Sequence, residues 1–417
     1  MIEMKTLYYK NLILTSKGIM FDTNQFKVYA LDEEHVLEFI KLLNHEVEEK
    51  DSIYYDKLLI TKKKFKELKI IKINMTNYCN LKCKYCFANE GTYNKINSSF
   101  SSKLISNLTK LLIQYPSIEY ITFFGGEPLL NIEGIIDICE VSRKVREDIK
   151  FYCQTNGTIM TNKIKKAIDK FDLKFTISID GAKEDNDRNR IFKNNTGTFD
   201  IIKKNYDFFK SNVQSIEATY DGASKYSKNE IADYLSSEFE CTNIAVCNLI
   251  GDEQTCYKVN PKKEIEEILQ NNYIPINKTK ELLIGFFSKV NQYFFCSAGS
   301  QLINIDSDGK IYPCHLLIDK KDKYVLGDLV NFNKLEFDSN RYNFIKNLDK
   351  DNYEKCSSCC ISWNCAKCYG AKEKFDFENC EIMLSTYMEI FEEIADEIIK
   401  GRLDLILSKL EGAIKYV

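Results

Sequence analysis

Six short apolar runs, separated by amphipathic segments, occupy residues 70–285 and restrict the folds open to this chain. Alternation of strand-like and helix-like segments favours a parallel sheet covered by helices. Six such repeats predict an α/β fold with a partial parallel β/α barrel that is open on one side. Ligand sites of barrels lie at the C-terminal ends of the strands. The runs are IIKINM, IEYITFF, IKFYCQ, LKFTISI, VQSIEATY and TNIAVCNLI.

Three cysteines follow the first of these strands, in the stretch MTNYCNLKCKYCF: Cys79, Cys83 and Cys86. A structural zinc site usually has four ligands in two pairs. Thiolates are the ordinary protein ligands of iron–sulfur clusters. Three of them can hold three irons of a four-iron cubane and leave the fourth iron open to a chelating small molecule. A zinc loop or buried free thiols are the alternatives.

Glycines and polar residues follow the next strands. Gly125 and Gly126, in FFGGEP, allow a ligand to approach the backbone, and Glu127 can accept hydrogen bonds from an ammonium group. Arg190 suits a carboxylate because its planar fork donates two parallel hydrogen bonds, and Asp187 is expected to orient its loop. Further polar residues at strand ends are Gln154, Asn156, Ser178, Asp180 and Thr219. For Ser178 and Thr219, ordinary strand-end hydrogen bonding is the alternative to ligand binding.

Seven further cysteines lie in the last third of the chain: Cys296, Cys314, Cys356, Cys359, Cys365, Cys368 and Cys380. An Asp-Gly pair between Cys296 and Cys314 predicts a hairpin turn. Two CxxC pairs suggest a zinc ribbon, but the spacing between them is too short for one. His315 can act as a base near neutral pH, or as a hydrogen-bonding partner of a metal centre.

The first cysteine stretch and the GGEP turn resemble those of the radical S-adenosylmethionine (SAM) superfamily. The resemblance implies a 4Fe–4S cluster on Cys79, Cys83 and Cys86, whose open iron binds SAM and whose electron cleaves it to a 5′-deoxyadenosyl radical. Tyr85 stands where this family has an aromatic residue. In the family the GGEP turn, here Gly125, Gly126 and Glu127, cradles the amino group of SAM, and a serine and an arginine, here Ser178 and Arg190, bind its carboxylate. Gln154, Asn156, Asp180 and Thr219 would line the same mouth, whereas Glu217 stands where the family often has a basic residue.

The later cysteines resemble the SPASM extension of such enzymes, which implies two auxiliary 4Fe–4S clusters and three clusters in all. The distal cluster would be held by Cys356, Cys359, Cys365 and Cys380, and the nearer one by Cys296, Cys314 and Cys368. Two residues separate Cys365 from Cys368, where the family usually has three. The nearer cluster has three ligands, so it either keeps an open iron for a substrate cysteine or takes Cys360 as a fourth. His315 replaces an aspartate base of sulfatase-maturing relatives, which counts against that activity.

The N-terminal stretch predicts strands between Thr6 and Ala30, then a helix capped by Asp32. It resembles the leader-peptide recognition element of peptide maturases, and a packing extension without a ligand is the alternative. We therefore expect three parts: a small α+β element at 1–68, the radical SAM core at 69–285 and the SPASM domain at 286–417. One amphipathic helix, Ile382 to Leu410, is expected to pack against the barrel.

Composition excludes several classes of protein. The formal net charge of -3 gives no basic excess for nucleic acid, and no apolar run is long enough to span a membrane. The stretch MIEMKTLYYKN lacks the apolar core of a secretion signal, so we expect a cytoplasmic location. Because disulfides are disfavoured in that compartment, clustered thiols among the sixteen cysteines favour metal binding.

The resemblance implies an oxidoreductase that forms thioether crosslinks in a cysteine-rich, ribosomally made precursor peptide with a leader. It also implies an electron donor such as a flavodoxin or ferredoxin. The alternatives are a carbon–carbon crosslinking or epimerising maturase, a sulfatase-maturating type of oxidation, and a non-catalytic iron–sulfur protein that binds peptides.

Overall fold

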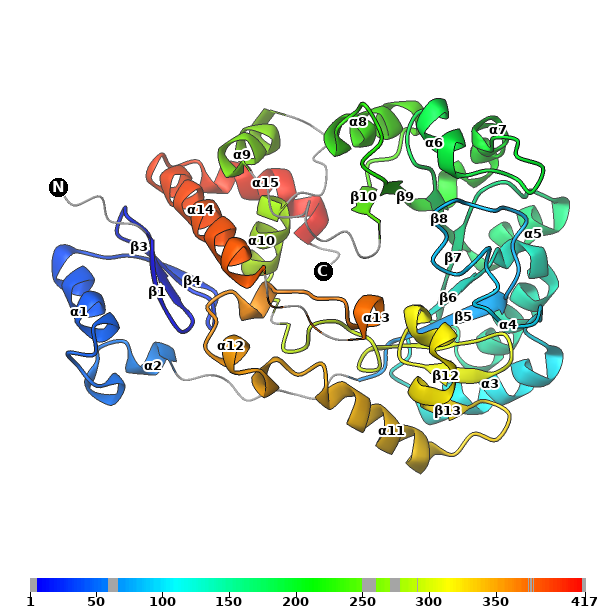
Figure 1. The fold of residues 1–417 in the computed structure, drawn as a ribbon, viewed down its shortest axis with the longest axis horizontal. Helices are drawn as coiled ribbons and strands as arrows, with labels where there is room; N and C mark the ends of the chain where they lie inside the picture. The colour runs from blue at the N-terminus through cyan, green and yellow to red at the C-terminus, as the bar shows by residue number, and fades with distance from the viewer. Residues whose placement is uncertain are drawn as a thin grey trace. The chain divides into compact units, whose positions relative to one another are not determined.

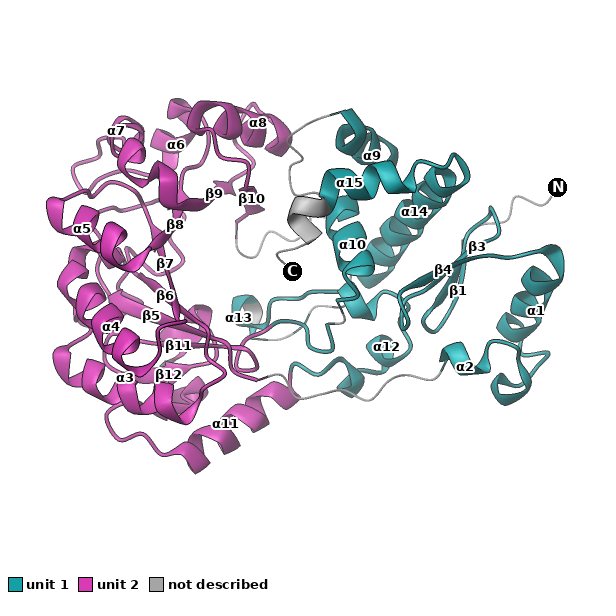
Figure 2. Cartoon of the chain, turned by 180° about the vertical axis from the view of Figure 1, so that it is seen from behind, with its two compact units in different colours: residues 1–64, 254–296, 348–417 teal, residues 65–253, 297–347 magenta. Residues whose placement is uncertain are grey.

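The computed structural model describes residues 6–58, 67–249, 260–270, 278–290, 292–373, 375, 377 and 379–414. The chain forms two compact units whose segments alternate along the sequence (Figure 2). One unit comprises residues 1–64, 254–296 and 348–417, and the other residues 65–253 and 297–347. The predicted division into three functional domains stays a prediction.

The second unit is built on a mixed sheet with the strand order β10-β9-β8-β7-β6-β5-β11-β12-β13 in the described residues (Figure 1). The strands from β5 to β10 run parallel, which confirms the predicted parallel α/β core. Their bounds are β5 Ile70–Thr76, β6 Tyr120–Gly125, β7 Lys150–Thr155, β8 Lys174–Ser178, β9 Val213–Tyr220 and β10 Ile244–Asn248.

Helices connect these strands and cover one face of the sheet. They are α3 Ser102–Gln114, α4 Ile132–Val145, α5 Asn162–Phe171, α6 Lys183–Asn189, α7 Phe199–Phe209 and α8 Lys228–Phe239, with short 3₁₀ turns at Pro128–Asn131 and Lys210–Asn212. Phe151 of β7 packs edge-on against Phe171 of α5, and Phe175 of β8 lies 4.8 Å from Phe209 of α7 between ring centroids. Apolar side chains at alternate strand positions therefore face the helices and form the core.

A hairpin from the cysteine-rich region completes this sheet. β11 (Leu302–Ile305) pairs parallel to β5, and β12 (Lys310–Tyr312) and β13 (Gly327–Asp328) follow antiparallel. Gly309, with φ +93°, makes the predicted turn. A 3₁₀ segment, His315–Tyr324, and helix α11 (Lys334–Lys346) lie beside the hairpin in the chain. The sequence predicted the hairpin but not its place at the edge of the barrel sheet.

The first unit begins with an antiparallel sheet in the order β1-β2-β3-β4: Leu7–Tyr9, Leu12–Leu14, Ile19–Asp22 and Lys27–Ala30. Helix α1 (Glu33–Leu43) follows, and the Asp32 carboxylate accepts a hydrogen bond from the His35 N–H at 2.9 Å. The predicted strands, helix and cap are thus confirmed. A 3₁₀ turn (Glu49–Asp51) and α2 (Tyr55–Leu58) complete the described part of this segment.

The C-terminal region forms two helices, α14 (Cys380–Ile399) and α15 (Leu403–Ile414), so the prediction of one continuous helix was wrong. Gly401 has φ +67°, and this left-handed glycine ends α14. Both helices are buried in a core with β2, β3, α9 (Pro261–Gln270) and α10 (Lys278–Phe287). The chain between α11 and α14 contains short helical turns at Lys350–Asn352, Glu354–Ser357, Ser362–Asn364 and Tyr369–Lys372. None of the helices in the described ranges is both long enough and apolar enough for a bilayer.

Candidate functional site

The three cysteines of the loop after β5 lie close together in the second unit. Each is partly buried, and burial, together with the neighbouring Glu127 and thiol charges, raises the pKa of Cys79 to about 12. The Cys86 N–H donates to the Cys83 carbonyl at 3.1 Å, and the Leu81 N–H donates to the Cys79 sulfur at 3.4 Å. Among the described residues, no three His, Cys, Asp or Glu side chains are grouped as ligands of a single metal ion. The donor set itself, three adjacent thiols with backbone N–H support, fits the ligation of an iron–sulfur cluster.

Gly125 and Gly126 bring the end of β6 against the residues that lead into the cysteine loop. A Cβ atom on Gly125 would lie 2.3 Å from the Thr76 carbonyl oxygen, and one on Gly126 would lie 2.0 Å from that of Tyr78. Gly125 also has φ +125°, which side chains disfavour. The glycines are therefore required for packing between two backbones, in addition to any ligand that they admit.

Glu127 joins the ends of β6 and β7. Its carboxylate is 1% exposed and accepts hydrogen bonds from the Thr155 hydroxyl (2.7 Å), the Asn156 N–H (2.9 Å) and the Leu129 N–H (3.1 Å). Burial raises the pKa of Glu127 to about 7, although these hydrogen bonds oppose the shift. Glu127 thus has a structural role that the sequence did not indicate, and its contact with an ammonium group stays a prediction.

Asp180 connects the cysteine loop to the ends of β8 and β9. It accepts hydrogen bonds from the Tyr85 hydroxyl, from the Arg190 Nε–H at 3.0 Å and from the Thr219 N–H at 3.0 Å. Asp180 and Arg190 are 3% and 8% exposed, and the Arg190 guanidinium carbon lies 5.6 Å from the Tyr85 ring centre. Burial opposes the charge of Arg190, but the attraction of Asp180 outweighs it and raises the pKa of Arg190.

Arg190 keeps hydrogen-bonding capacity for a ligand, because only its Nε–H is bonded among the described residues. Its loop is fixed by Asp187, whose carboxylate accepts hydrogen bonds from the N–H groups of Thr198 (2.7 Å) and Phe199 (2.8 Å). The expectation that Asp187 orients this loop is confirmed.

The other predicted mouth residues also lie at these strand ends. The Asn156 amide donates to the Cys79 sulfur at 3.7 Å and to the Asn80 side chain at 3.0 Å. Gln154 donates to Glu217, and Ser178 is the register partner of Glu217 in the next strand. The structure therefore brings the cysteine loop and the ends of β6 to β9 together, although none of these contacts tests cofactor binding itself.

His315 lies between two aromatic rings of the same unit. Its ring is 5.4 Å from Phe87, which follows Cys86, and 5.0 Å from Phe124 of β6. Its Nδ1 is buried, and no group in the described part of the chain hydrogen-bonds to it. Burial and the charge of Lys72 lower the pKa of His315 well below its ordinary value, so the ring is neutral. Its predicted role as a base stays a prediction.

Four of the C-terminal cysteines line one cavity in the first unit. The cavity has a volume of about 390 Å³, and Cys356, Cys359, Cys365 and Cys380 line it together with Lys350. Burial raises the pKa of Cys356 to about 11, with further contributions from the other three thiols. Four thiols that line one cavity are the type of ligand that iron–sulfur clusters take.

The three cysteines predicted for the nearer cluster are divided between the units. Cys296 and Cys368 belong to the first unit and Cys314 to the second. Their convergence on one cluster therefore stays a prediction. Cys360 is 1% exposed within the apolar core of the first unit, beside Ile361 and Trp363, and is packed as an apolar side chain.

Comparison with known proteins identifies two families. The model of the radical SAM superfamily matches residues 73–237, and that of the SPASM iron–sulfur cluster-binding domain matches residues 296–360. The uncharacterized protein MJ0907 of Methanocaldococcus jannaschii is 30% identical over 64% of this chain and 91% of its own length. The cysteine-type anaerobic sulfatase-maturating enzyme of Clostridium perfringens (strain 13) is 26% identical over 75% of this chain and 92% of its own. The solved structure of native anSMEcpe with bound AdoMet and Cp18Cys peptide has a TM-score of 0.62 at 21% identity, over 81% of this chain and 99% of that one.

Proposed function

Because the chain belongs to the radical SAM superfamily and carries a SPASM iron–sulfur cluster-binding domain, we propose that it is an enzyme that modifies a peptide. The observation that carries this proposal is the grouping of the three loop thiols with the GGEP turn and the Asp180–Arg190 pair at one edge of a parallel sheet. A peptide substrate is further supported by the solved neighbour, which binds AdoMet and a peptide.

The residues at this edge would hold a cluster and SAM in the following way. Cys79, Cys83 and Cys86 would provide three thiolates, and the remaining N–H donors of Arg190 would bind the carboxylate of SAM. When bound, the cluster and SAM supply a carbon radical that removes a hydrogen atom from the substrate. Asp180 keeps Arg190 oriented, and the Tyr85–Asp180 hydrogen bond fixes the cysteine loop relative to it. These residues thus position the cofactor.

We further propose that the C-terminal cysteines hold two auxiliary clusters. The four thiols around the cavity of the first unit suit a fully ligated cluster. Cys296, Cys314 and Cys368 would hold the second, with one position open to a substrate thiolate.

The specific reaction that we propose is thioether formation between a substrate cysteine and a carbon of the same peptide. Two features of the sequence motivate it: only three cysteines are predicted for the nearer cluster, and His315 stands in place of an aspartate base. His315 is neutral and has a buried nitrogen that lacks a hydrogen-bond partner in the described structure, so it can accept a proton only weakly. Oxidation of a cysteine of the sulfatase-maturating type is the second candidate, because a relative of that name matches over most of its length.

The N-terminal sheet is proposed to bind the leader of the precursor. Within the described structure β4 pairs only with β3, so one side of β4 has free backbone groups. Both ends of β4 are exposed, so a leader strand can add there through main-chain hydrogen bonds. An electron carrier of the flavodoxin or ferredoxin type completes the system.

The test is anaerobic reconstitution of the full chain, followed by reduction in the presence of SAM. We expect release of 5′-deoxyadenosine, and its loss when Cys83 is replaced by alanine. Cys247, which is exposed, is the matched control, and Cys247→Ala should behave as the wild type. With a cysteine-containing precursor, mass spectrometry should find a loss of two hydrogens and one fewer alkylatable thiol for each crosslink. Wild-type protein that binds zinc and releases no deoxyadenosine would refute the proposal.

A further inference from the structure

The face of the barrel sheet that points away from the helices is polar and partly buried. In β5 to β9, side chains alternate between fully buried apolar residues that face the helices and partly buried residues on the opposite face. Lys72 and Glu217 carry opposite charges on this second face, which also includes Thr122, Phe124, Gln154 and Lys174. Two opposite charges on this inner face require either each other or a ligand.

Lys72 contacts an aromatic ring at this face but has no ionic partner among the described residues. Its ammonium group lies 4.3 Å from the centre of the Phe124 ring, and in the described structure it makes neither a hydrogen bond nor an ion pair. The Phe124 ring in turn contacts His315. The side chain of Lys72 thus reaches toward the C-terminal ends of the strands. The cysteine loop starts at this end of the sheet.

Glu217 presents the opposite charge. Gln154 donates a hydrogen bond to one of its carboxylate oxygens, and the other oxygen is free among the described residues. Lys72 of β5 and Glu217 of β9 lie on the same inner face, and they form no ion pair within the described structure. Burial lowers the pKa of Lys72 and raises that of Glu217, and the charge of each residue opposes the shift of the other. A group with one acceptor and one donor can therefore bridge the ammonium and the carboxylate.

We propose that Lys72 and Glu217 bind one amide group of the peptide substrate, with Lys72 donating to the carbonyl and Glu217 accepting from the N–H. An amide carries both functions on one planar group, and the Phe124 ring offers a flat apolar surface beside it. This inference rests on the proposed function, since it names the part of the peptide that the inner face recognises. It also gives Glu217 a role in substrate recognition at a position where the family often has a basic residue.

Lys174 provides a matched control. It is joined to Lys72 through the register partners Thr122 and Tyr152, and it lies on the same face of the sheet. Its ammonium group is paired with Asp172 at 2.7 Å, at the N-terminal end of β8. A lysine in the same register row of the sheet thus already has an ionic partner of its own.

The experiment measures binding without turnover, on the anaerobically reconstituted full chain with SAM and without reductant. The probe is N-acetylalanine N-methylamide, and its fully N-methylated analogue, which retains both carbonyls but has no N–H, is the comparison. Titrations followed by ligand NMR should give a preference of about tenfold for the first probe. Lys72→Met should weaken it about tenfold, and Glu217→Leu should abolish the preference, with partial recovery in Glu217→Gln. Lys174→Met should bind as the wild type.

Propionamide distinguishes a side-chain carboxamide of the substrate from its main chain, because tighter binding of this probe would assign the site to Asn or Gln. Equal affinities of the wild type for the first probe and its methylated analogue would overturn the proposal, as would wild-type affinities in both Lys72→Met and Glu217→Leu. Circular dichroism of each variant separates loss of binding from loss of folding. Absence of 5′-deoxyadenosine under reducing conditions refutes the proposed function, whereas the binding titration does not depend on that reaction.

Discussion

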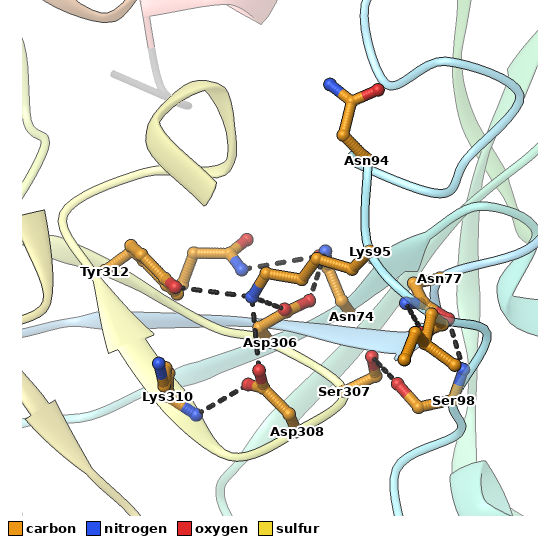
Figure 3. A network of polar contacts seen from close by, with 12 residues as sticks. Asn74, Asn77, Asn94, Lys95, Ser98, Asp306, Ser307, Asp308, Lys310 and Tyr312 are labelled. Carbon is orange, nitrogen blue, oxygen red and sulfur yellow. Dashed lines mark hydrogen bonds and ion pairs between the residues drawn. The ribbon is translucent and has the colours of Figure 1, made fainter. Parts of the chain in front are cut away.

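Replacement of Lys95 by methionine should loosen the segment that links the first cysteine loop to α3. Lys95 donates to Asp306 at 2.6 Å and to Asp308 at 3.1 Å, and Asp306 also accepts from Asn74 at 3.2 Å (Figure 3). The segment that this pair secures is strained, because its residues with positive φ include the non-glycine residues Asn89, Glu90, Tyr93 and Asn94. Each costs about 1 kcal/mol unless surrounding contacts hold it.

The magnitude follows from the burial of the two partners. Asp306 is 0% exposed, and loss of one partner of a buried ion pair costs about 3–5 kcal/mol. The side chain of Lys95 is 24% exposed, so we reduce this figure to about 2–3 kcal/mol. Burial opposes the charge of Lys95, but the hydrogen bond and charge of Asp306 outweigh it and raise the pKa of Lys95. Its stabilisation is therefore complete below the pKa of an unfolded lysine and is lost only above the raised value, so an experiment at pH 7 measures all of it.

Amide hydrogen exchange is the assay, because it reports local opening. In Lys95→Met, exchange in residues 89–99 and 305–312 should accelerate by about 30- to 150-fold. The control is Lys310→Met on the same hairpin, since the Lys310–Asp322 pair is exposed to solvent and contributes little to stability. Equal exchange in the two variants would refute the reasoning that Lys95 holds the segment in place.

Three further outcomes are expected. Gly126→Ala should abolish cluster loading, measured as iron per chain, because its Cβ would collide with the carbonyl oxygen of Tyr78. SAM affinity, measured by calorimetry, should fall about tenfold from pH 8 to pH 6. The reason is that Glu127, whose pKa is raised to about 7, must be ionised to attract an ammonium group. Glu127→Gln should remove most of this pH dependence. Cys365→Ala should lower the iron content of the reconstituted chain, whereas Cys360→Ala should leave it unchanged, because Cys360 is packed within the apolar core.

The barrel strands could be predicted from the sequence because their burial is periodic. Ile71 and Ile73 of β5, for example, are fully buried while Lys72 between them is not. This alternation of apolar and polar residues can be recognised in the amino-acid sequence. The gathering of Glu127, Asn156 and Asp180 at one edge then follows from topology alone, since parallel strands end on the same side. Local pattern and chain direction are enough for this part of the site.

Other features depend on contacts that no local pattern encodes. The pairing of Leu302 with Ile70 joins strands from distant parts of the sequence, and a four-residue strand does not specify its neighbour. The sequence identifies Asp180 only as a polar residue at a strand end, and its hydrogen bonds to Tyr85, Arg190 and Thr219 appear only when the strand ends are brought together. By contrast, the end of α14 could have been found, because Gly401 is an ordinary helix-termination signal.

Glu217 illustrates how a departure from a family pattern is explained by a second residue. A basic side chain at position 217 would face Lys72 across the same inner face, and two like charges in a partly buried site repel each other strongly. Burial lowers the pKa of Lys72, and the charge of Glu217, followed by that of Cys314, opposes this shift. The charges at positions 72 and 217 therefore depend on each other. An acidic residue at position 217 is explained only when the lysine at position 72 is considered with it.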